Sequence, residues 1–235
     1  MSMEWRYFTE PEAMAEVAAE LVTHQARQAV AARNLFSLVL AGGSTPLPLY
    51  RLLAAPPWHE RMPWAATHLF QGDERCLPPD HPESNFGRIN ASLLTPSQLP
   101  PAHIHRMAGE LPPSQGAAEY RRQLATFGHD FDLILLGMGT DGHVASLFPY
   151  SPLLAAEEEL VAAVEEPAGA PPVPRLTLTL TAINRAATVI IMATGEQKAA
   201  IAAEIRHAPQ RAADKYPAAR VKPREQLWWL ISENG

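Results

Sequence analysis

Six short apolar runs alternate with helix-like segments along this chain, and that alternation limits the folds open to it more than any other feature. The runs have the length of β-strands: FSLVLA (36–41), THLFQ (67–71), DLILLGM (132–138), RLTLTL (175–180), ATVIIMAT (187–194) and EQLWWLIS (225–232). Helical patterns lie between them or before them, at 10–33, 48–55, 115–127 and 195–206. Strands that alternate with helices are typical of a parallel sheet covered on both faces. The pattern therefore predicts an α/β fold with a mainly parallel sheet.

The composition is that of an ordinary globular chain and favours one domain. The 235 residues are 47% hydrophobic and 19% charged, so the chain can bury a large core. A Pro-, Ala- and Gly-rich stretch at 167–174 is the nearest thing to a linker. Only about 60 residues follow it, which is short for an independent domain. We therefore expect a single domain over residues 1–235, with a mobile loop at this stretch; whether a longer segment, 150–174, moves on binding stays open.

Charge, apolar run length and cysteine usage exclude several classes of protein. The formal net charge of −6 gives no overall attraction to nucleic acid or an anionic membrane, so an anionic ligand needs a local cluster of cations. No run approaches the roughly 20 apolar residues of a membrane-spanning helix, and the start, MSMEWRYFTE, is polar and unlike a signal peptide. The single cysteine, Cys76, excludes an intramolecular disulfide and fits a reducing compartment. We expect a cytoplasmic protein without nucleic-acid or membrane partners; its oligomeric state stays open, a monomer included.

The segment DLILLGMGTDGHVASLFP (132–149) is the strongest candidate for an active site. Its apolar strand ends in a glycine-rich turn that presents Asp141 and His143 at the carboxyl end of the strand, where open α/β sheets bind ligands. Imidazole titrates near neutral pH and a neighbouring carboxylate can stabilise its charged form, so His143 is a candidate general base. In the competing interpretation Asp141 caps a following helix and His143 lies on the surface. Two potential ligands without an obvious third make a weak zinc signature, so no metal is expected.

The motif GGSTP (42–46) lies between a predicted strand and a predicted helix. Backbone N–H groups of Gly42 and Gly43, together with the hydroxyls of Ser44 and Thr45, could hold a phosphate there. A tight turn in which Ser44 or Thr45 only caps the helix explains the motif equally well. The motif lacks the lysine of a nucleotide-binding loop.

The motif GDER (72–75) follows the second apolar run. If the strands are parallel, Asp73 and Arg75 reach the same sheet edge as GGSTP and His143, and the arginine could bind a phosphate or a carboxylate. The alternative is a solvated loop with a local ion pair.

Two isolated basic residues complete the set of candidates. Lys198 lies in the first turn of the helix at 195–206, where its charge opposes the helix dipole unless an anion binds. A solvent-exposed lysine is an equally good explanation. Arg175 follows the rigid segment PPVP, which fixes its position, although a lone arginine is more often a surface residue.

Five blocks of this sequence resemble, in the same order, motifs of the 6-phosphogluconolactonase family. They are LVLAGGSTPLPLY, FQGDERCLPPDHPESNFGRIN, DLILLGMGTDGHVASLFP, PRLTLTLTAIN and ATGEQKAAI, and the resemblance extends over nearly the whole chain. It implies a three-layer α/β/α, Rossmann-like domain related to glucosamine-6-phosphate isomerase. It also implies hydrolysis of 6-phosphoglucono-δ-lactone to 6-phosphogluconate in the oxidative pentose phosphate pathway, without a cofactor.

Matched motif by motif, the resemblance implies that His143 is the general base and Asp141 the acid group beside it. Binding of the sugar and its phosphate falls to residues of the other blocks: Gly42, Gly43, Ser44, Thr45, Asp73, Arg75, Arg175 and Lys198. The departures are mild. Ala41 stands where serine is more common, and Cys76 occupies a variable position.

Two other functions stay open as alternatives. The isomerase family shares GSTP and DGH, but its motif continues to Asn-Glu-Pro and supplies an acid for ring opening. Here the corresponding residues are Leu147, Phe148 and Pro149, which argues against an isomerase. A non-catalytic sugar-phosphate-sensing domain would lack the base and would usually carry a DNA-binding helical domain, whereas this chain has both Asp141 and His143.

Overall fold

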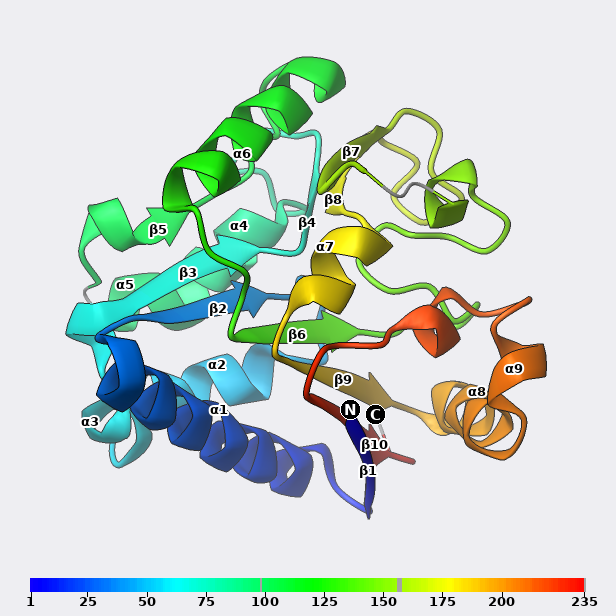
Figure 1. Ribbon diagram of the computed structural model, residues 1–235, viewed down its shortest axis with the longest axis horizontal. Helices are drawn as coiled ribbons and strands as arrows, with labels where there is room; N and C mark the ends of the chain where they lie inside the picture. Colours follow the sequence, from blue (N-terminus) through cyan, green and yellow to red (C-terminus); the bar gives the residue numbers. More distant parts are fainter. Residues whose placement is uncertain (98, 156–157, 235) are drawn as a thin grey trace.

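A seven-stranded, fully parallel sheet forms the centre of the protein, in a computed structural model that describes residues 1–97, 99–155 and 158–234 (Figure 1). The strand order is β1-β10-β9-β6-β2-β3-β5. These strands are β1 (Ser2–Phe8), β2 (Phe36–Leu40), β3 (Thr67–Gln71), β5 (Ile104–His105), β6 (Leu133–Gly137), β9 (Thr188–Thr194) and β10 (Gln226–Ser232). The predicted parallel sheet is confirmed, and its five predicted strands begin and end within about one residue of the expected limits.

Helices cover both faces of this sheet and make three layers. The four predicted helices are present as α1 (Pro11–Arg33), α2 (Leu47–Leu53), α6 (Pro113–Phe127) and α8 (Glu196–His207). Short helices fill the connections: α3 (Trp58–Arg61), α4 (Asn85–Ile89), α5 (Thr95–Ser97), α7 (Leu180–Arg185) and α9 (Pro209–Ala212). Single turns of 3₁₀ helix and one π-helical turn, at 90–94, complete the connections. None of the helices in the described part of the chain is long and apolar enough to cross a membrane.

Alternate residues of the central strands feed two hydrophobic cores. Leu133 and Leu135 of β6 pack with α1 and α2 in one core, while Ile134 and Leu136 pack with α6, α7 and α8 in the other. All four side chains are fully buried. A strand that is buried on both faces reads as a continuous apolar run, which is why this strand was evident in the sequence.

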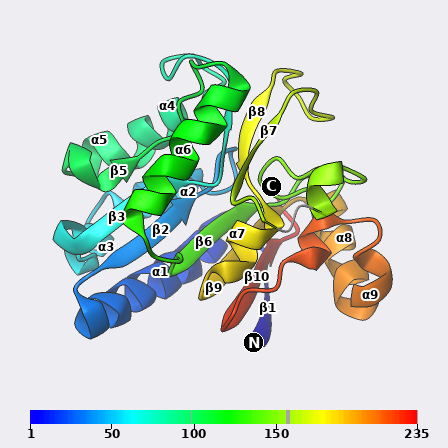
Figure 2. The ribbon, with the colours of Figure 1, turned by 45° about the horizontal axis from the view of Figure 1, so that its top comes forward.

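The predicted strand at 175–180 is present as β8 (Arg175–Leu178), but it lies outside the parallel sheet. A second, antiparallel sheet contains β4 (Asp73–Arg75), β8 (Arg175–Leu178) and β7 (Val161–Val164), in the order β4-β8-β7. Figure 2 shows β7 and β8 projecting away from the central strands, beside α6. The chain then returns to the central sheet as β9 and β10. This return supports a single domain, which stays a prediction.

Two strands of the central sheet, the two-residue β5 and the longer β1, were not predicted at all. Residues 2–8 form β1, which pairs in parallel with β10 at the sheet edge. The indole rings of Trp5 and Trp229 stack there, with centroids 4.6 Å apart. Its sequence, MEWRY, does alternate apolar and charged residues, so a signal was available.

Candidate active site

A cavity of about 320 Å³ opens at the carboxyl ends of β2, β3, β6 and β9. Nine of the ten predicted site residues line it: Gly42, Gly43, Ser44, Thr45, Asp73, Arg75, His143, Arg175 and Lys198. The tenth, Asp141, lies behind His143 and contacts it. Because parallel strands end at one edge, motifs that are far apart in the sequence meet at one place.

Asp141 and His143 form a hydrogen-bonded pair at this edge. The Nδ1 atom of His143 lies 2.6 Å from Oδ1 of Asp141, and the backbone N–H of His143 donates to the same oxygen at 3.1 Å. Burial raises the pKa of the Asp141 carboxyl, but the hydrogen bond and charge of His143 outweigh it and hold that pKa below its ordinary value. We assign the Nδ1 proton to this bond from its geometry, which leaves the Nε2 lone pair free to accept a proton.

The glycine-rich turn fixes where this pair stands. Gly139 donates its backbone N–H to the carbonyl of His143 at 2.9 Å, and a Cβ atom at Gly139 would lie only 2.1 Å from the imidazole Nδ1. Gly142 has a φ of +78°, and a Cβ there would meet the Tyr216 ring at 2.5 Å. Residues 139–149 form turns and isolated bridges rather than a helix, so the interpretation of Asp141 as a helix cap is wrong.

An apolar wall supports the imidazole. The buried ring of Phe148 lies 4.8 Å from the His143 ring, centroid to centroid, and the guanidinium carbon of Arg175 lies 5.6 Å from the Phe148 centroid. Leu147 beside it is also buried. The residues that replace Asn-Glu-Pro of the isomerase motif therefore present hydrocarbon, and no carboxylate, beneath the imidazole of His143.

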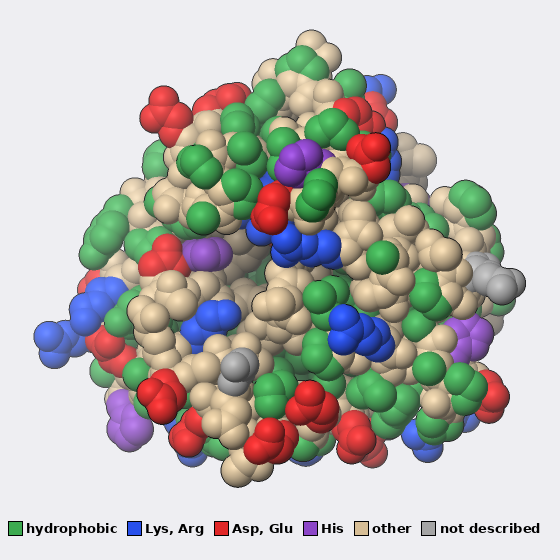
Figure 3. Space-filling view, turned by 180° about the vertical axis from the view of Figure 1, so that it is seen from behind, with side chains coloured by type: hydrophobic (Ala, Val, Ile, Leu, Met, Phe, Trp, Pro, Cys, Tyr) green, Lys and Arg blue, Asp and Glu red, His purple; other side chains and the backbone are tan. Residues whose placement is uncertain are grey.

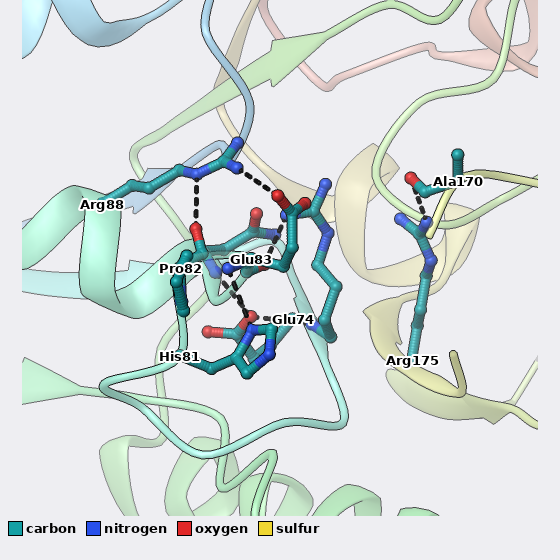
Figure 4. Close-up of polar contacts among 9 residues, drawn as sticks. Glu74, His81, Pro82, Glu83, Arg88, Ala170 and Arg175 are labelled. Carbon is teal, nitrogen blue, oxygen red and sulfur yellow. Dashed lines mark hydrogen bonds and ion pairs between the residues drawn. The ribbon is translucent and has the colours of Figure 1, made fainter. Parts of the chain in front are cut away.

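Arg75 and Arg175 stand directly opposite each other, on the paired strands β4 and β8. Like charges directly opposite on neighbouring strands destabilise a sheet, unless an anion lies between or beside them. Arg75 donates from Nη1 to the carbonyl of Glu83 at 2.6 Å. Arg175 donates from Nη2 to the carbonyl of Ala170 at 2.9 Å (Figure 4). The Nε atoms of both arginines are buried and have no partner within the described residues. Arg175 is only 4% exposed, so its interpretation as a surface residue is wrong.

Lys198 adds a third cation to the cavity. It lies in the first turn of α8, is half-buried, and burial lowers its pKa. Across residues 1–97, 99–155 and 158–234, neither this lysine nor the two arginines form an ion pair with a carboxylate. Seen from behind, the molecule has a hollow near the middle of its surface with Lys and Arg side chains around it (Figure 3). The cavity thus gathers unbalanced positive charge in a chain whose net charge is −6.

The two carboxylates of GDER are both buried and point to different neighbours. Asp73 accepts from Ser146 Oγ at 2.7 Å and from Asn85 Nδ2 at 3.2 Å. Glu74 accepts the backbone N–H groups of Asn85 and Phe86 at the start of α4, each at 2.7 Å, and burial raises its pKa. The interpretation of GDER as a solvated loop with a local ion pair is therefore wrong, since Asp73 and Glu74 are buried and hydrogen-bonded.

The sequence interpretation missed Asn85, which lines the cavity, and Ser146, which is buried behind it against Asp73. Asn85 comes from the SNFG block, where Ser84 caps α4 by accepting the N–H of Gly87 at 3.2 Å. A Cβ at Gly42 would lie 2.1 Å from the Asn85 Cγ atom, so only glycine fits there. The block was visible in the sequence, but nothing local showed that its asparagine would reach Asp73.

The GGSTP loop lies against the end of β9. Its Gly43 has a φ of +81°, and the hydroxyls of Thr45 and Thr194 are 3.2 Å apart. The helix α2 has Pro46 as its N-cap and no side-chain capping bond, so the interpretation of Ser44 or Thr45 as a helix cap is wrong. The role of the loop in phosphate binding stays a prediction.

A larger cavity, of about 800 Å³, lies at the opposite edge of the sheet. Its lining carries both signs of charge, and three ion pairs form there among the described residues: Arg33 with Asp132, Arg121 with Glu159 and Arg224 with Asp130. It also lies away from every predicted site residue. Charge imbalance, more than volume, distinguishes the smaller cavity as the candidate active site.

Comparison with known proteins points to one family. The model of glucosamine-6-phosphate isomerases/6-phosphogluconolactonase matches residues 9–229. A 6-phosphogluconolactonase of Synechocystis is 39% identical over 220 residues, covering 90% of this chain and 88% of its own, and that of Thermotoga maritima is 36% identical over 197 residues, covering 83% and 84%.

Solved structures agree with the sequence relatives. The crystal structure of the Thermotoga maritima 6-phosphogluconolactonase has a TM-score of 0.87 at 31% identity, covering 98% of this chain and 100% of its own. A monomeric glucosamine-6-phosphate deaminase has a TM-score of 0.83 at 18% identity, which shows a shared fold alone. With its motifs, its fold and these relatives in agreement, the chain belongs to the glucosamine-6-phosphate isomerase/6-phosphogluconolactonase family.

Proposed function

We propose that this protein is a 6-phosphogluconolactonase, which hydrolyses 6-phosphoglucono-δ-lactone to 6-phosphogluconate in the oxidative pentose phosphate pathway. One observation carries the proposal: the His143–Asp141 pair opens on the same cavity as three cations that have no carboxylate partner in the described chain. A phosphorylated ester requires both parts: cationic side chains to bind its phosphate and a general base to activate the water that attacks its carbonyl. The activity is that of the sequence relatives named above.

His143 acts as the general base in this proposal. Its Nε2 takes a proton from water while the water oxygen attacks the lactone C1 carbonyl, and the carbonyl π electrons move onto the carbonyl oxygen. Backbone N–H groups or a cationic side chain of the cavity stabilise that oxyanion. The tetrahedral intermediate then breaks the bond between C1 and the ring oxygen, and the imidazolium returns its proton to the departing oxygen. The products are a carboxylic acid, which ionises, and a free hydroxyl.

Asp141 holds the imidazole in the required tautomer and stabilises its charged form. General-base assistance contributes roughly 10²–10⁴-fold, which together with positioning suffices for a lactone that already hydrolyses in water. Arg75, Arg175 and Lys198 would bind the phosphate and sugar oxygens. Asp73 would act mainly by orienting Ser146 and Asn85, because both of its oxygens accept hydrogen bonds from those side chains.

The alternative within the family, glucosamine-6-phosphate isomerase or deaminase, requires an acid near the ring oxygen. Leu147 and Phe148, both buried and apolar, supply none at the position where that family has glutamate. A sugar-phosphate sensor without activity would not need the hydrogen-bonded pair of Asp141 and His143. These observations favour the lactonase. We further propose a cytoplasmic location and no nucleic-acid partner, in keeping with the single cysteine and the acidic net charge.

The test is a coupled assay with freshly generated lactone, corrected for spontaneous hydrolysis. The chain should accelerate acid release, and His143→Ala should lower kcat by about 10²–10⁴-fold with little change in KM. His207→Ala, at an exposed histidine near the end of α8, is the matched control and should behave as the original chain.

Three outcomes would contradict the proposal. Near-normal turnover by a folded His143→Ala variant would remove the base assignment. Ammonia release from glucosamine 6-phosphate without lactone hydrolysis would favour the isomerase. Tight binding of 6-phosphogluconate without any acceleration would favour a sensor.

A further inference from the structure

Strand β1 leaves one edge of the central sheet open over seven residues. No described strand lies beyond it, whereas the opposite edge ends in the two-residue β5. Figures 1 and 2 both draw β1 at the outside of the sheet. Most of its side chains are exposed, including two large apolar ones, Met3 at 43% and Tyr7 at 45%. An open edge of this length is a template for another strand.

Hydrogen bonding to β10 uses only half of the main-chain groups of β1. The N–H of Ser2 donates to the carbonyl of Glu225, the residue before β10, at 2.8 Å. The main-chain groups of Ser2 and of the other even-numbered residues of β1 therefore point toward β10. Hydrogen-bonding direction alternates along a strand. The N–H and C=O groups of Met3, Trp5 and Tyr7 therefore face the open edge, and a second strand could bond to all of them.

The side chains of β1 are arranged symmetrically about Trp5. Met3 and Tyr7 lie on either side of Trp5 on the same face of the sheet. Glu4 and Arg6 lie on the opposite face, one before and one after Trp5 in the strand. We infer that two copies of this chain associate through β1, as antiparallel strands related by a two-fold axis at Trp5. In that register Glu4 of each copy stands opposite Arg6 of the other, and Met3 stands opposite Tyr7. The two central sheets become one continuous sheet across the interface.

Charge selects this register over its neighbours. With a two-fold axis perpendicular to the sheet, the same face of both copies points the same way. Odd-numbered residues of one β1 can therefore stand opposite only odd-numbered residues of the other, and even-numbered opposite even-numbered. Moving the axis to Glu4 would place two glutamates face to face, and moving it to Arg6 would do the same with two arginines. Like charges directly opposite are destabilising, whereas opposite charges stabilise. Only the axis at Trp5 pairs unlike charges twice.

The geometry of the pairs adds to the preference. The main-chain N–H and C=O groups of Trp5 face the open edge, so in the dimer the two Trp5 residues bond to each other. Glu4 of one copy and Arg6 of the other then stand opposite without main-chain hydrogen bonds between them, and at such positions side chains approach more closely. Glu4 has no partner in the described part of the chain. Arg6 has its guanidinium 4.9 Å from the Trp228 ring centroid, which holds it on the same face as Glu4. Both charges are thus in place for the second copy.

Charge reversal at this edge tests the inference by sedimentation velocity over a range of protein concentrations. The original chain should dimerise, and Glu4→Arg or Arg6→Glu should each raise the dimer dissociation constant by about tenfold or more, since two contacts per dimer become repulsive. The double variant, Glu4→Arg with Arg6→Glu, should restore dimerisation. Glu60→Arg, an exposed residue of α3, changes net charge equally and should leave the equilibrium unchanged.

Amide hydrogen exchange gives a second readout that identifies the strand and the register. The amide protons of Met3, Trp5 and Tyr7 should exchange slowly in the dimer and rapidly in the Glu4→Arg variant or on dilution. A chain that stays monomeric up to millimolar concentration would overturn the inference. So would a dimer that both single variants leave intact, or one in which these three amides remain unprotected.

Discussion

Substituting Asp141 with asparagine isolates the contribution of the carboxylate to the proposed base. A hydrogen bond to a charged group contributes roughly 1.5–3 kcal/mol. The side chains of His143 and Asp141 are 27% and 44% exposed, so solvent weakens their contact. We therefore expect about half of that value, roughly 0.75–1.5 kcal/mol, to be lost from transition-state stabilisation. Since about 1.4 kcal/mol is tenfold in rate, kcat should fall by about 3- to 13-fold.

The loss should appear in kcat and in kcat/KM equally, because the imidazolium that Asp141 stabilises forms only during the reaction. The assay is the coupled lactone assay, with Asp214→Asn, at an exposed aspartate, as the control. An unchanged kcat, or a loss confined to KM, would refute the reasoning.

Three other predictions follow from contacts in the structure. Lys198→Met should raise KM for the phosphorylated lactone by about 10- to 100-fold while kcat/KM for unphosphorylated gluconolactone stays the same; equal losses on both substrates would contradict a phosphate contact. Gly139→Ala should lower kcat by about 10²-fold while the circular dichroism spectrum stays unchanged. The added Cβ would lie 2.1 Å from Nδ1 of His143 and would push the imidazole out of place. Burial and the neighbouring charges of His68 and His103 lower the pKa of His105 from 6.5 to about 4. Between pH 6.5 and pH 4 the unfolded chain therefore binds a proton at His105 that the folded chain does not bind. The free energy of unfolding should therefore fall by about 1–2 kcal/mol as the pH drops from 6.5 to 4, allowing for partial exposure, and urea titrations of His105→Phe should show a smaller fall.

The sequence by itself determined the central strands and the residues that end them. Each apolar run between two helices is a local pattern, and a strand buried on both faces shows it strongly. His143 and Asp141 follow such a run directly, so their place at the sheet edge required only that the strands be parallel. Strand β1 had a weaker pattern, because an edge strand with exposed side chains has few apolar positions to reveal it.

Tertiary structure alone decided how the cationic side of the site is assembled. Arg75 and Arg175 stand opposite each other although one hundred positions separate them, and their strands belong to a small antiparallel sheet that the alternation pattern did not predict. The contact of Asn85 with Asp73 likewise depends on where α4 packs. Strand and helix patterns arise from neighbours along the chain, whereas these contacts depend on which surfaces meet when the chain buries its apolar area, and no local pattern encodes that choice.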